Sequence, residues 1–386
     1  NLEHLWMPFS ANRGFKSEPR LMNEAKGMYY KKLDGTKVLD GTAGLWCCNA
    51  GHGNEKIVKA IQDQAAKLDF APSFQMGHPL AFEAAEKLLS IAPSNDFQYT
   101  FFTNSGSEAV DTALKIALGY QHHRGKTDKT ILIGRERAYH GVGFGGISVG
   151  GLPLNKKHFS LLPSVDHICA THNLEKNAFS KGQPEWGKEL AEDLLQVIEK
   201  HGAGKIAAFI TEPLAGSTGV LVPPKGYLER IREICTQNDI LLIFDEVITG
   251  FGRLGAPFAA QYFDVEPDMI TCAKGLTSGT IPMGAVIVKK EIYDAYQDGD
   301  AKSIDLFHGY TYSAHPMAAA ALIASLDVYT EDNLFERTNE LASYWEDALH
   351  SLKGTSHVID IRNLGLVAGI EMSPREGSPG TRGYDV

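Results

Sequence analysis

One lysine between two small residues is the strongest candidate for covalent chemistry. Lys274 follows the short apolar run Met269–Cys272 and lies between Ala273 and Gly275. Burying an ammonium group is costly, so a lysine in such a place is generally paired or reactive. Desolvation lowers the pKa of an amine and makes it nucleophilic, as Schiff-base formation requires. A structural lysine that reaches solvent is the alternative, and this segment alone does not decide between them.

A carboxylate follows another apolar run. Asp245 and Glu246 come directly after Leu241–Phe244, and in open α/β sheets ligands bind at the carboxyl edge of the strands. A carboxylate at that edge can pair with a protonated ring nitrogen and make the ring an electron sink. A helix cap or a structural ion pair is the alternative, because a buried carboxylate needs some partner.

A third segment is suited to binding an anion. Ser105, Gly106 and Ser107 follow the expected strand Tyr99–Thr103 and open an expected helix over Glu108–His122. Free N–H groups at a helix start bind phosphate well, a glycine allows close approach, and serine hydroxyls add donors. An ordinary helix cap remains the alternative.

An aromatic residue completes the set. Tyr139 and His140 lie beyond the expected strand Thr130–Ile133. A tyrosine at a strand exit can stack on a flat cofactor ring, although core packing is the commoner fate of an aromatic side chain. Only the combination of phosphate cradle, carboxylate, lysine and aromatic residue makes a specific hypothesis.

These residues need a sheet to bring them together. Between about residues 56 and 290, helical patterns alternate with short apolar runs, which predicts an α/β domain with a mostly parallel sheet. The expected strands are Tyr99–Thr103, Thr130–Ile133, Ile206–Thr211, Leu241–Phe244, Met269–Cys272 and Ala285–Val288. Several are continuous apolar runs, as expected for strands covered on both faces.

The two ends of the chain have a different pattern. Helices are expected over Pro316–Tyr329 and Leu334–Leu352, followed by strands at Val358–Ile361 and Leu366–Glu371. We therefore predict three segments: residues 1–50 and 291–386 form a smaller α+β domain, and residues 51–290 form the large one. The polar, Gly-rich stretch Gly380–Val386 leads us to expect a chain that is incomplete at its C-terminus.

Composition excludes several classes of protein. The 386 residues are 43% apolar and 22% charged, with a formal net charge of −10, which opposes binding to nucleic acid or anionic lipid. No apolar run approaches the roughly 20 residues of a membrane span, and we find no secretion signal. The five cysteines show neither a disulfide framework nor a metal spacing. We expect a cytoplasmic protein without a metal.

Two motif matches are rejected. Residues 141–146 fit the G-x-G-x-x-G dinucleotide pattern, and residues 146–150 fit the G-x-S-x-G nucleophile elbow. Both motifs should open a helix directly after a strand, whereas residues 147–153 are rich in glycine and are not expected to form a good helix. A NAD-dependent dehydrogenase is therefore the weakest alternative function.

The sequence resembles the class III, fold type I, pyridoxal-phosphate-dependent aminotransferases over its whole length. It is most similar to the branch that uses ω-amino acids or β-alanine with pyruvate. The most specific stretch is Leu241–Arg253, which reads LLIFDEVITGFGR and is followed by Lys274. The resemblance implies a mostly parallel seven-stranded sheet in a large domain, a smaller α+β domain, and active sites at the interface of a homodimer or a tetramer.

The resemblance also implies roles for individual residues. Lys274 is expected to carry pyridoxal 5'-phosphate as a Schiff base, Asp245 to pair with the pyridinium nitrogen, and Val247 to lie under the ring. The remaining expected contacts with the cofactor come from Ser105, Gly106, Ser107, Tyr139, His140 and Glu212. Thr311 is expected to reach the phosphate of the neighbouring subunit, and Trp46, with Tyr139, to line the substrate pocket.

Substrate choice is less well defined. The resemblance implies an ω-amino acid such as β-alanine, or an amine, as donor and pyruvate as acceptor, with alanine as product. The family's arginine that binds substrate carboxylates is expected beyond residue 386. A class III aminotransferase that uses 2-oxoglutarate, or a pyridoxal-phosphate aminomutase, is the alternative, because the same residues serve all of these enzymes.

Overall fold

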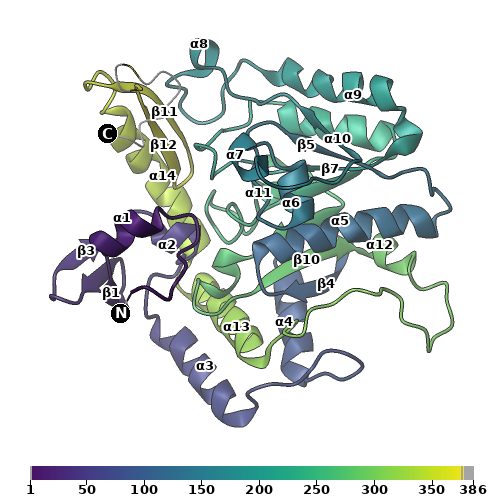
Figure 1. Ribbon diagram of the computed structural model, residues 1–386, viewed down its shortest axis with the longest axis horizontal. Helices are drawn as coiled ribbons and strands as arrows, with labels where there is room; N and C mark the ends of the chain where they lie inside the picture. Colours follow the sequence, from purple (N-terminus) through teal and green to yellow (C-terminus); the bar gives the residue numbers. More distant parts are fainter. Residues whose placement is uncertain (1, 375–376, 378–386) are drawn as a thin grey trace.

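The fold is built on a central seven-stranded sheet (Figure 1). The computed structural model describes residues 2–374 and 377. The strand order is β4-β10-β9-β8-β7-β5-β6. Every pair is parallel except those of β10, which is antiparallel to both β4 and β9. The strands are β4 (Phe97–Thr103), β5 (Ile131–Arg135), β6 (Val165–Ile168), β7 (Ile206–Thr211), β8 (Leu241–Asp245), β9 (Met269–Cys272) and β10 (Gly284–Lys289). The predicted α/β class is confirmed.

Helices cover both faces of this sheet, so the strands contribute side chains to two hydrophobic cores, one on each face. Residues of α4 (Pro79–Leu89), α9 (Asp193–His201), α10 (Tyr227–Gln237) and α13 (Pro316–Glu331) share one core with Leu242 and Phe244. Residues of α5 (Gly106–His123) share the other core with Leu241 and Ile243. Because successive side chains of a strand point to opposite faces, the apolar run of β8 is buried on both sides. This explains its continuous hydrophobic pattern.

Two smaller sheets stand beside the central one (Figure 1). The first is antiparallel and contains β1 (Met22–Lys26), β2 (Tyr29–Lys32) and β3 (Lys37–Leu39). The second pairs β11 (Val358–Leu364) with β12 (Val367–Met372), next to α14 (Leu334–His350). In Figure 1 the two sheets lie on the same side of the molecule. The division at residues 50 and 290 stays a prediction.

The remaining helices are short, except α3 (Glu55–Lys67), which packs on α13. They are α1 (Asn12–Ser17), α2 (Ala43–Trp46), α6 (Phe144–Val149), α7 (Pro153–Lys156), α8 (Leu174–Asn177), α11 (Ala259–Phe263) and α12 (Lys290–Asp294), with 3-10 turns η1 (Lys188–Glu192), η2 (Ala203–Lys205) and η3 (Lys274–Thr277). None of the helices among the described residues is long and apolar enough to cross a membrane.

Two local expectations differ from the structure. Strand β6 was not expected, because its sequence Val-Asp-His-Ile is short and half polar at the edge of the sheet. The expectation of no helix after the Gly-rich motif is wrong, since α6 spans Phe144–Val149. Its glycines allow close packing: a Cβ at Gly145 would lie 2.8 Å from Oδ1 of Asp111, which accepts a bond from Gly146 N–H. Tertiary contact here outweighs low helix propensity.

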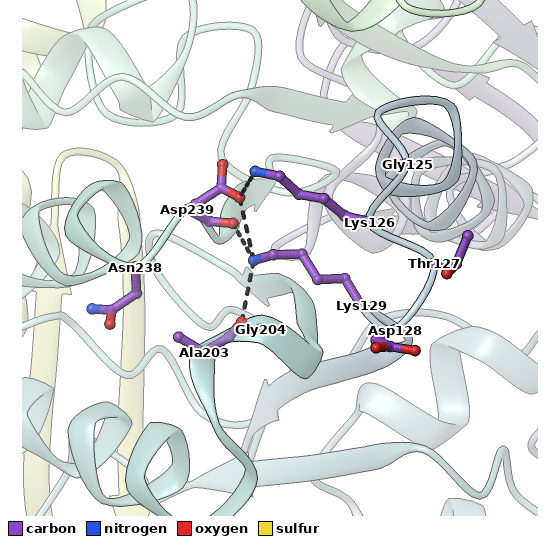
Figure 2. Close-up of a pocket in the computed structure, with 9 residues that line it drawn as sticks. All are labelled: Gly125, Lys126, Thr127, Asp128, Lys129, Ala203, Gly204, Asn238 and Asp239. Carbon is purple, nitrogen blue, oxygen red and sulfur yellow. Dashed lines mark hydrogen bonds and ion pairs between the residues drawn. The ribbon is translucent and has the colours of Figure 1, made fainter.

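A buried lysine joins three segments at the amino ends of β5, β7 and β8. Figure 2 shows Lys129 Nζ directed at Asp239 and Ala203. Its ammonium donates to the carbonyl oxygens of Ala203 at 3.2 Å, Ile206 at 3.1 Å and Asp239 at 2.5 Å. Burial lowers the pKa of Lys129, and Asp239 partly opposes that effect. Lys126 also pairs with Asp239 but is only half-buried.

Replacing this lysine should destabilise the protein. Lys129→Met leaves three carbonyl groups, of which that of Ile206 is buried, without their donor, so we expect a loss of about 3 kcal/mol and a thermal midpoint lower by several degrees. Lys126→Met, in the same pocket, removes only a surface ion pair and should cost less than about 1 kcal/mol. Thermal unfolding of the two variants, followed by circular dichroism, makes the comparison. Equal midpoints would contradict the assigned role of Lys129.

The Gly380–Val386 stretch, on which the expectation of an incomplete C-terminus depends, lies outside the described residues.

Candidate active site

A cavity of about 430 Å³ lies where the strands end. Its lining contains most of the predicted site residues, which come from segments far apart in the chain. The lining residues are Leu45, Trp46, Gly106, Ser107, Tyr139, His140, Gly141, Glu212, Ser217, Asp245, Val247, Ile248, Ala273 and Lys274. The sheet therefore brings together the lysine, the carboxylate, the helix start and the aromatic residue that the sequence singled out.

Lys274 lies on a constrained turn directly after β9. Its φ of 49° falls in the left-handed region, which costs a residue other than glycine free energy. The 3-10 turn that follows is closed by Gly279 N–H, which donates to the Lys274 carbonyl at 3.1 Å. Burial lowers the pKa of Lys274, and the nearby Cys47, Asp245 and Glu212 oppose that effect. The amine is thus prepared to be neutral and nucleophilic at lower pH than an ordinary lysine.

Asp245 is held in one orientation by three donors. It is 4% exposed, and its Oδ2 lies 2.7 Å from Nδ1 of His140. Its Oδ1 accepts from Val247 N–H and from the Thr271 hydroxyl, each at 3.2 Å. The Nε2 atom of His140 is buried and has no hydrogen-bond partner among the described residues. A carboxylate fixed in this way can hold a proton on a ring nitrogen placed in the cavity.

Glu212 adds a second buried carboxyl group. Its Oε2 accepts from the backbone N–H of Tyr139 at 3.1 Å. Burial raises the pKa of Glu212 to about 7; Asp245 also raises it, whereas His140 and Arg135 lower it. Burial likewise raises the pKa of Tyr139, with further contributions from Asp245 and Glu212. Glu212 therefore fixes the backbone that presents the Tyr139 ring.

The start of α5 is the candidate anion site, and its two serines are placed differently. Ser105 is the N-cap, and its hydroxyl accepts from Glu108 N–H at 3.2 Å. Ser105 is absent from the cavity lining, so the predicted contact of its side chain with the cofactor stays a prediction. Gly106 and Ser107 do line the cavity. A Cβ at Gly106 would lie 2.9 Å from the Val247 methyl groups, so only glycine fits there.

Trp46 stands on a strained segment. Four successive residues, from Ala43 to Trp46, have positive φ angles, which non-glycine residues rarely adopt. The guanidinium of Arg253 lies 5.8 Å from the centre of the Trp46 ring, within the range of a cation–π contact. Trp46 lines the cavity, as does its neighbour Leu45; its role as a wall of the substrate pocket stays a prediction.

Thr311 lies elsewhere. It is exposed and is not among the residues that line the cavity. Its expected contact with the neighbouring subunit therefore stays a prediction.

Sequence reasoning missed Leu45, Ser217 and Ile248, all of which line the cavity. Ile248 had a usable signal, because it follows Val247 directly in the same motif; Ser217 had none.

The chemistry of the cavity fits pyridoxal phosphate. An amine is available at Lys274, a fixed carboxylate at Asp245 and free helix-start N–H groups at Gly106 and Ser107. The backbone at Gly141 approaches the cradle closely, because a Cβ there would lie 2.5 Å from Ser107 Oγ. These residues match the three parts of the cofactor that a protein must recognise: the aldehyde, the ring nitrogen and the phosphate.

A second cluster of possible ligands has a different explanation. His172, Asp360 and Glu371 place one ligand atom each within 4.8 Å of one another. The guanidinium of Arg362 donates to Glu371 at 2.7 Å, lies 3.2 Å from His172 Nε2 and pairs with Asp360. A guanidinium of the protein therefore already pairs with both carboxylates of this cluster.

Together the sheet and the lysine–aspartate cavity define an α/β enzyme of the pyridoxal-phosphate-dependent kind. The aminotransferase class-III family model matches residues 10–379, and the chain belongs to this family. Class III aminotransferases depend on pyridoxal phosphate. The predicted family, enzyme class and cofactor are confirmed.

Named relatives cover the whole chain. An omega-aminotransferase of Caulobacter vibrioides is 60% identical over 100% of this chain and 88% of its own length. A beta-alanine–pyruvate aminotransferase of Pseudomonas aeruginosa is 49% identical over 100% of this chain and 86% of its own. A solved ω-transaminase of Pseudomonas jessenii, in complex with PMP, is 33% identical with a TM-score of 0.90, covering 96% of this chain and 83% of that one.

The burial of Lys274 leads to a titration experiment. In protein freed of cofactor, the Lys274 amine should become reactive at lower pH than that of Lys181, whose pKa is raised by its hydrogen bond to Asp347. The sign follows because a lowered lysine pKa gives the neutral amine at lower pH. Competitive acetylation across a pH series, resolved by peptide mass spectrometry, measures both sites at once. A higher midpoint for Lys274 would contradict the effect of burial.

Proposed function

We propose that this enzyme transfers the amino group of an ω-amino acid such as β-alanine, or of a simple amine, to pyruvate and so produces alanine. The convergence of Lys274 and Asp245 in one cavity is the observation that supports transamination. The names of the most similar relatives, an omega-aminotransferase and a beta-alanine–pyruvate aminotransferase, support the choice of substrates.

Each residue has a task in this proposal. Bound pyridoxal phosphate supplies an electron-withdrawing ring that stabilises negative charge on the donor's carbon. Lys274 holds the cofactor through its amine; once released, that amine takes the proton from the donor's Cα and delivers it to C4′. Asp245, oriented by His140, keeps the ring nitrogen protonated. Burial lowers the pKa of Lys274 and so favours the uncharged amine that must accept the donor's proton.

Other residues position the two partners. Gly106 and Ser107, with Ser105 as the cap of the same helix, bind the phosphate. Tyr139 and Val247 both line the cavity and would hold the cofactor ring there, and Glu212 supports Tyr139 through its backbone bond. Trp46 forms a wall of the substrate pocket, next to Tyr139.

The assembly and location extend the same proposal. We propose a homodimer, or a tetramer built from dimers, in which Thr311 of one subunit reaches the phosphate held by its neighbour. A cytoplasmic location and the division into a large domain (51–290) and a small domain (1–50 and 291–386) are part of this proposal. The alternatives are a class III enzyme that uses 2-oxoglutarate and a pyridoxal-phosphate aminomutase.

Two acceptors distinguish the proposed reaction from its nearest alternative. The holoenzyme is first converted to its amino form with β-alanine, and then pyruvate or 2-oxoglutarate is added. We expect pyruvate to restore the original visible absorbance and to yield alanine. Restoration by 2-oxoglutarate but not by pyruvate would contradict the substrate assignment while leaving the aminotransferase class intact.

Borohydride reduction tests the site itself. Reduction of the holoenzyme should fix the cofactor on the peptide that contains Lys274, as seen by mass spectrometry. Lys274→Ala should lose this adduct and roughly 10²- to 10⁴-fold or more in turnover, since it removes the group that moves the proton. The control is Lys129→Arg, which replaces a buried lysine outside the cavity by another cation. This variant should still form the adduct at Lys274. Cofactor fixed on any other residue would overturn the assignment.

A further inference from the structure

A second cavity, of about 590 Å³, lies beside the strained segment from Ala43 to Trp46. Its lining combines residues next to the small N-terminal sheet with the first turns of α14 and with Arg253. Three of its lining residues are Asp40, Cys48 and His52, none of which lines the lysine cavity. A thiol, an imidazole and a carboxylate therefore border one space that the proposed transamination does not use.

The three side chains form a hydrogen-bonded chain. Cys48 Sγ lies 3.6 Å from His52 Nδ1, and His52 Nε2 lies 2.7 Å from Asp40 Oδ2. With the ring proton on Nε2 donated to Asp40, Nδ1 is left as an acceptor for the thiol proton. This is the nucleophile–base–orienting group arrangement by which cysteine is activated.

The base is held rigidly in place. The His52 and Asp40 side chains are only 12% and 4% exposed. The His52 backbone exchanges two hydrogen bonds with Gly27, at 2.7 and 2.9 Å, and its ring packs against Tyr30 with centroids 4.5 Å apart. Asp40 Oδ1 accepts from both the N–H and the hydroxyl of Thr42 at 3.1 Å. Such fixed geometry is what a base must have to act on one thiol.

The thiol needs this base in order to react. Burial raises the pKa of Cys48 to about 11; Cys47 and Asp40 add to that effect, and Arg253 opposes it. The free thiolate is therefore scarce near neutral pH, and reaction depends on passing the proton to His52 as the new bond forms. Cys169 provides a natural contrast, because burial and Asp193 raise its pKa to about 12.

We propose that Cys48 is a covalent modification site, where the thiol, with His52 as base and Asp40 as its orienting group, adds to small α,β-unsaturated carbonyl compounds. The Sγ–carbon bond forms at the β-carbon while the C=C π bond breaks. The thiol proton passes to His52 and then to the α-carbon, so no oxidant or co-reactant is needed. Arg253 also lines the cavity, and its buried Nε has no hydrogen-bond partner among the described residues, which leaves a donor for the carbonyl oxygen.

An adduct on the Cys48 sulfur should change the shape of the lysine cavity. A Cβ placed at Gly44 would lie 2.9 Å from Cys48 Sγ, and one at Gly279 would lie 3.4 Å from it. Gly44 precedes Trp46 on the strained segment, and Gly279 closes the turn that carries Lys274. Added bulk on Cys48 therefore presses on the two segments that supply the substrate wall and the lysine.

The experiment labels the holoenzyme with N-ethylmaleimide, an unsaturated carbonyl probe, and follows each cysteine by peptide mass spectrometry. Cys48 should react first, at least 10-fold faster than the half-buried Cys169. His52→Gln should slow Cys48 at least 10-fold and leave Cys169 unchanged. Asp40→Asn is the second variant and should slow Cys48 as well, with folding of both variants checked by thermal unfolding. Equal rates at Cys48 and Cys169, or an unchanged Cys48 rate in both variants, would overturn the proposal.

A second readout tests the link to the lysine cavity. Turnover of the wild-type holoenzyme should fall with the same time course as Cys48 labelling, and Cys48→Ala should keep turnover and resist the reagent. If the reagent inactivated Cys48→Ala as fast as it inactivates the wild type, the link would be overturned. Labelling rates do not depend on which amine or keto acid the enzyme uses, so failure here is distinguishable from failure of the proposed function.

Discussion

The burial of charged groups at one edge of a sheet is the constraint that shapes this molecule. Lys274, Asp245 and Glu212 all lie where parallel strands end. Burying the charged form of each side chain there costs free energy unless neighbouring groups pair with it or its pKa shifts. The bond of Asp245 to His140 and the bond of Glu212 to the Tyr139 backbone provide that pairing. For Lys274 the response is a lowered pKa, and this is the property that its proposed chemistry uses. Stability and reactivity thus have the same physical origin.

Most of the fold was predictable because its strands are buried on both faces. The runs Ile206–Thr211 and Met269–Cys272 coincide with β7 and β9, since short, mainly apolar runs that alternate with helical patterns are typical of strands buried on both faces. Strand β6 was not predictable, because an edge strand with one polar side needs no such pattern. Helix α6 was missed because its glycines serve contact with Asp111, a residue distant in sequence.

The candidate site was predictable in its chemistry but not in its finer positions. The lysine, the aspartate and the helix-start glycine could be found from the sequence. A charged side chain after an apolar strand is unfavourable unless it is paired or reactive, and a glycine at a helix start allows close approach of an anion. The difference between Ser105, which caps α5, and Ser107, which lines the cavity, depends on helix geometry that sequence does not resolve. The Cys48–His52–Asp40 chain was invisible for another reason: its members lie on a loop and a turn without a repeating pattern.

The reversed strand β10 has a consequence for reshaping this enzyme. Its first residue, Gly284, touches the end of the phosphate cradle, since a Cβ there would lie 2.4 Å from the Ser105 carbonyl oxygen. The start of β10 therefore packs against the residue that caps α5, and β10 also pairs with β9, the strand that precedes Lys274. The wall made by Leu45 and Trp46 belongs to a separate, strained segment with Leu45 largely exposed. Substitutions intended to admit bulkier amines are therefore better placed at Leu45 and Trp46, because the close packing at Gly284 leaves almost no space for a larger side chain.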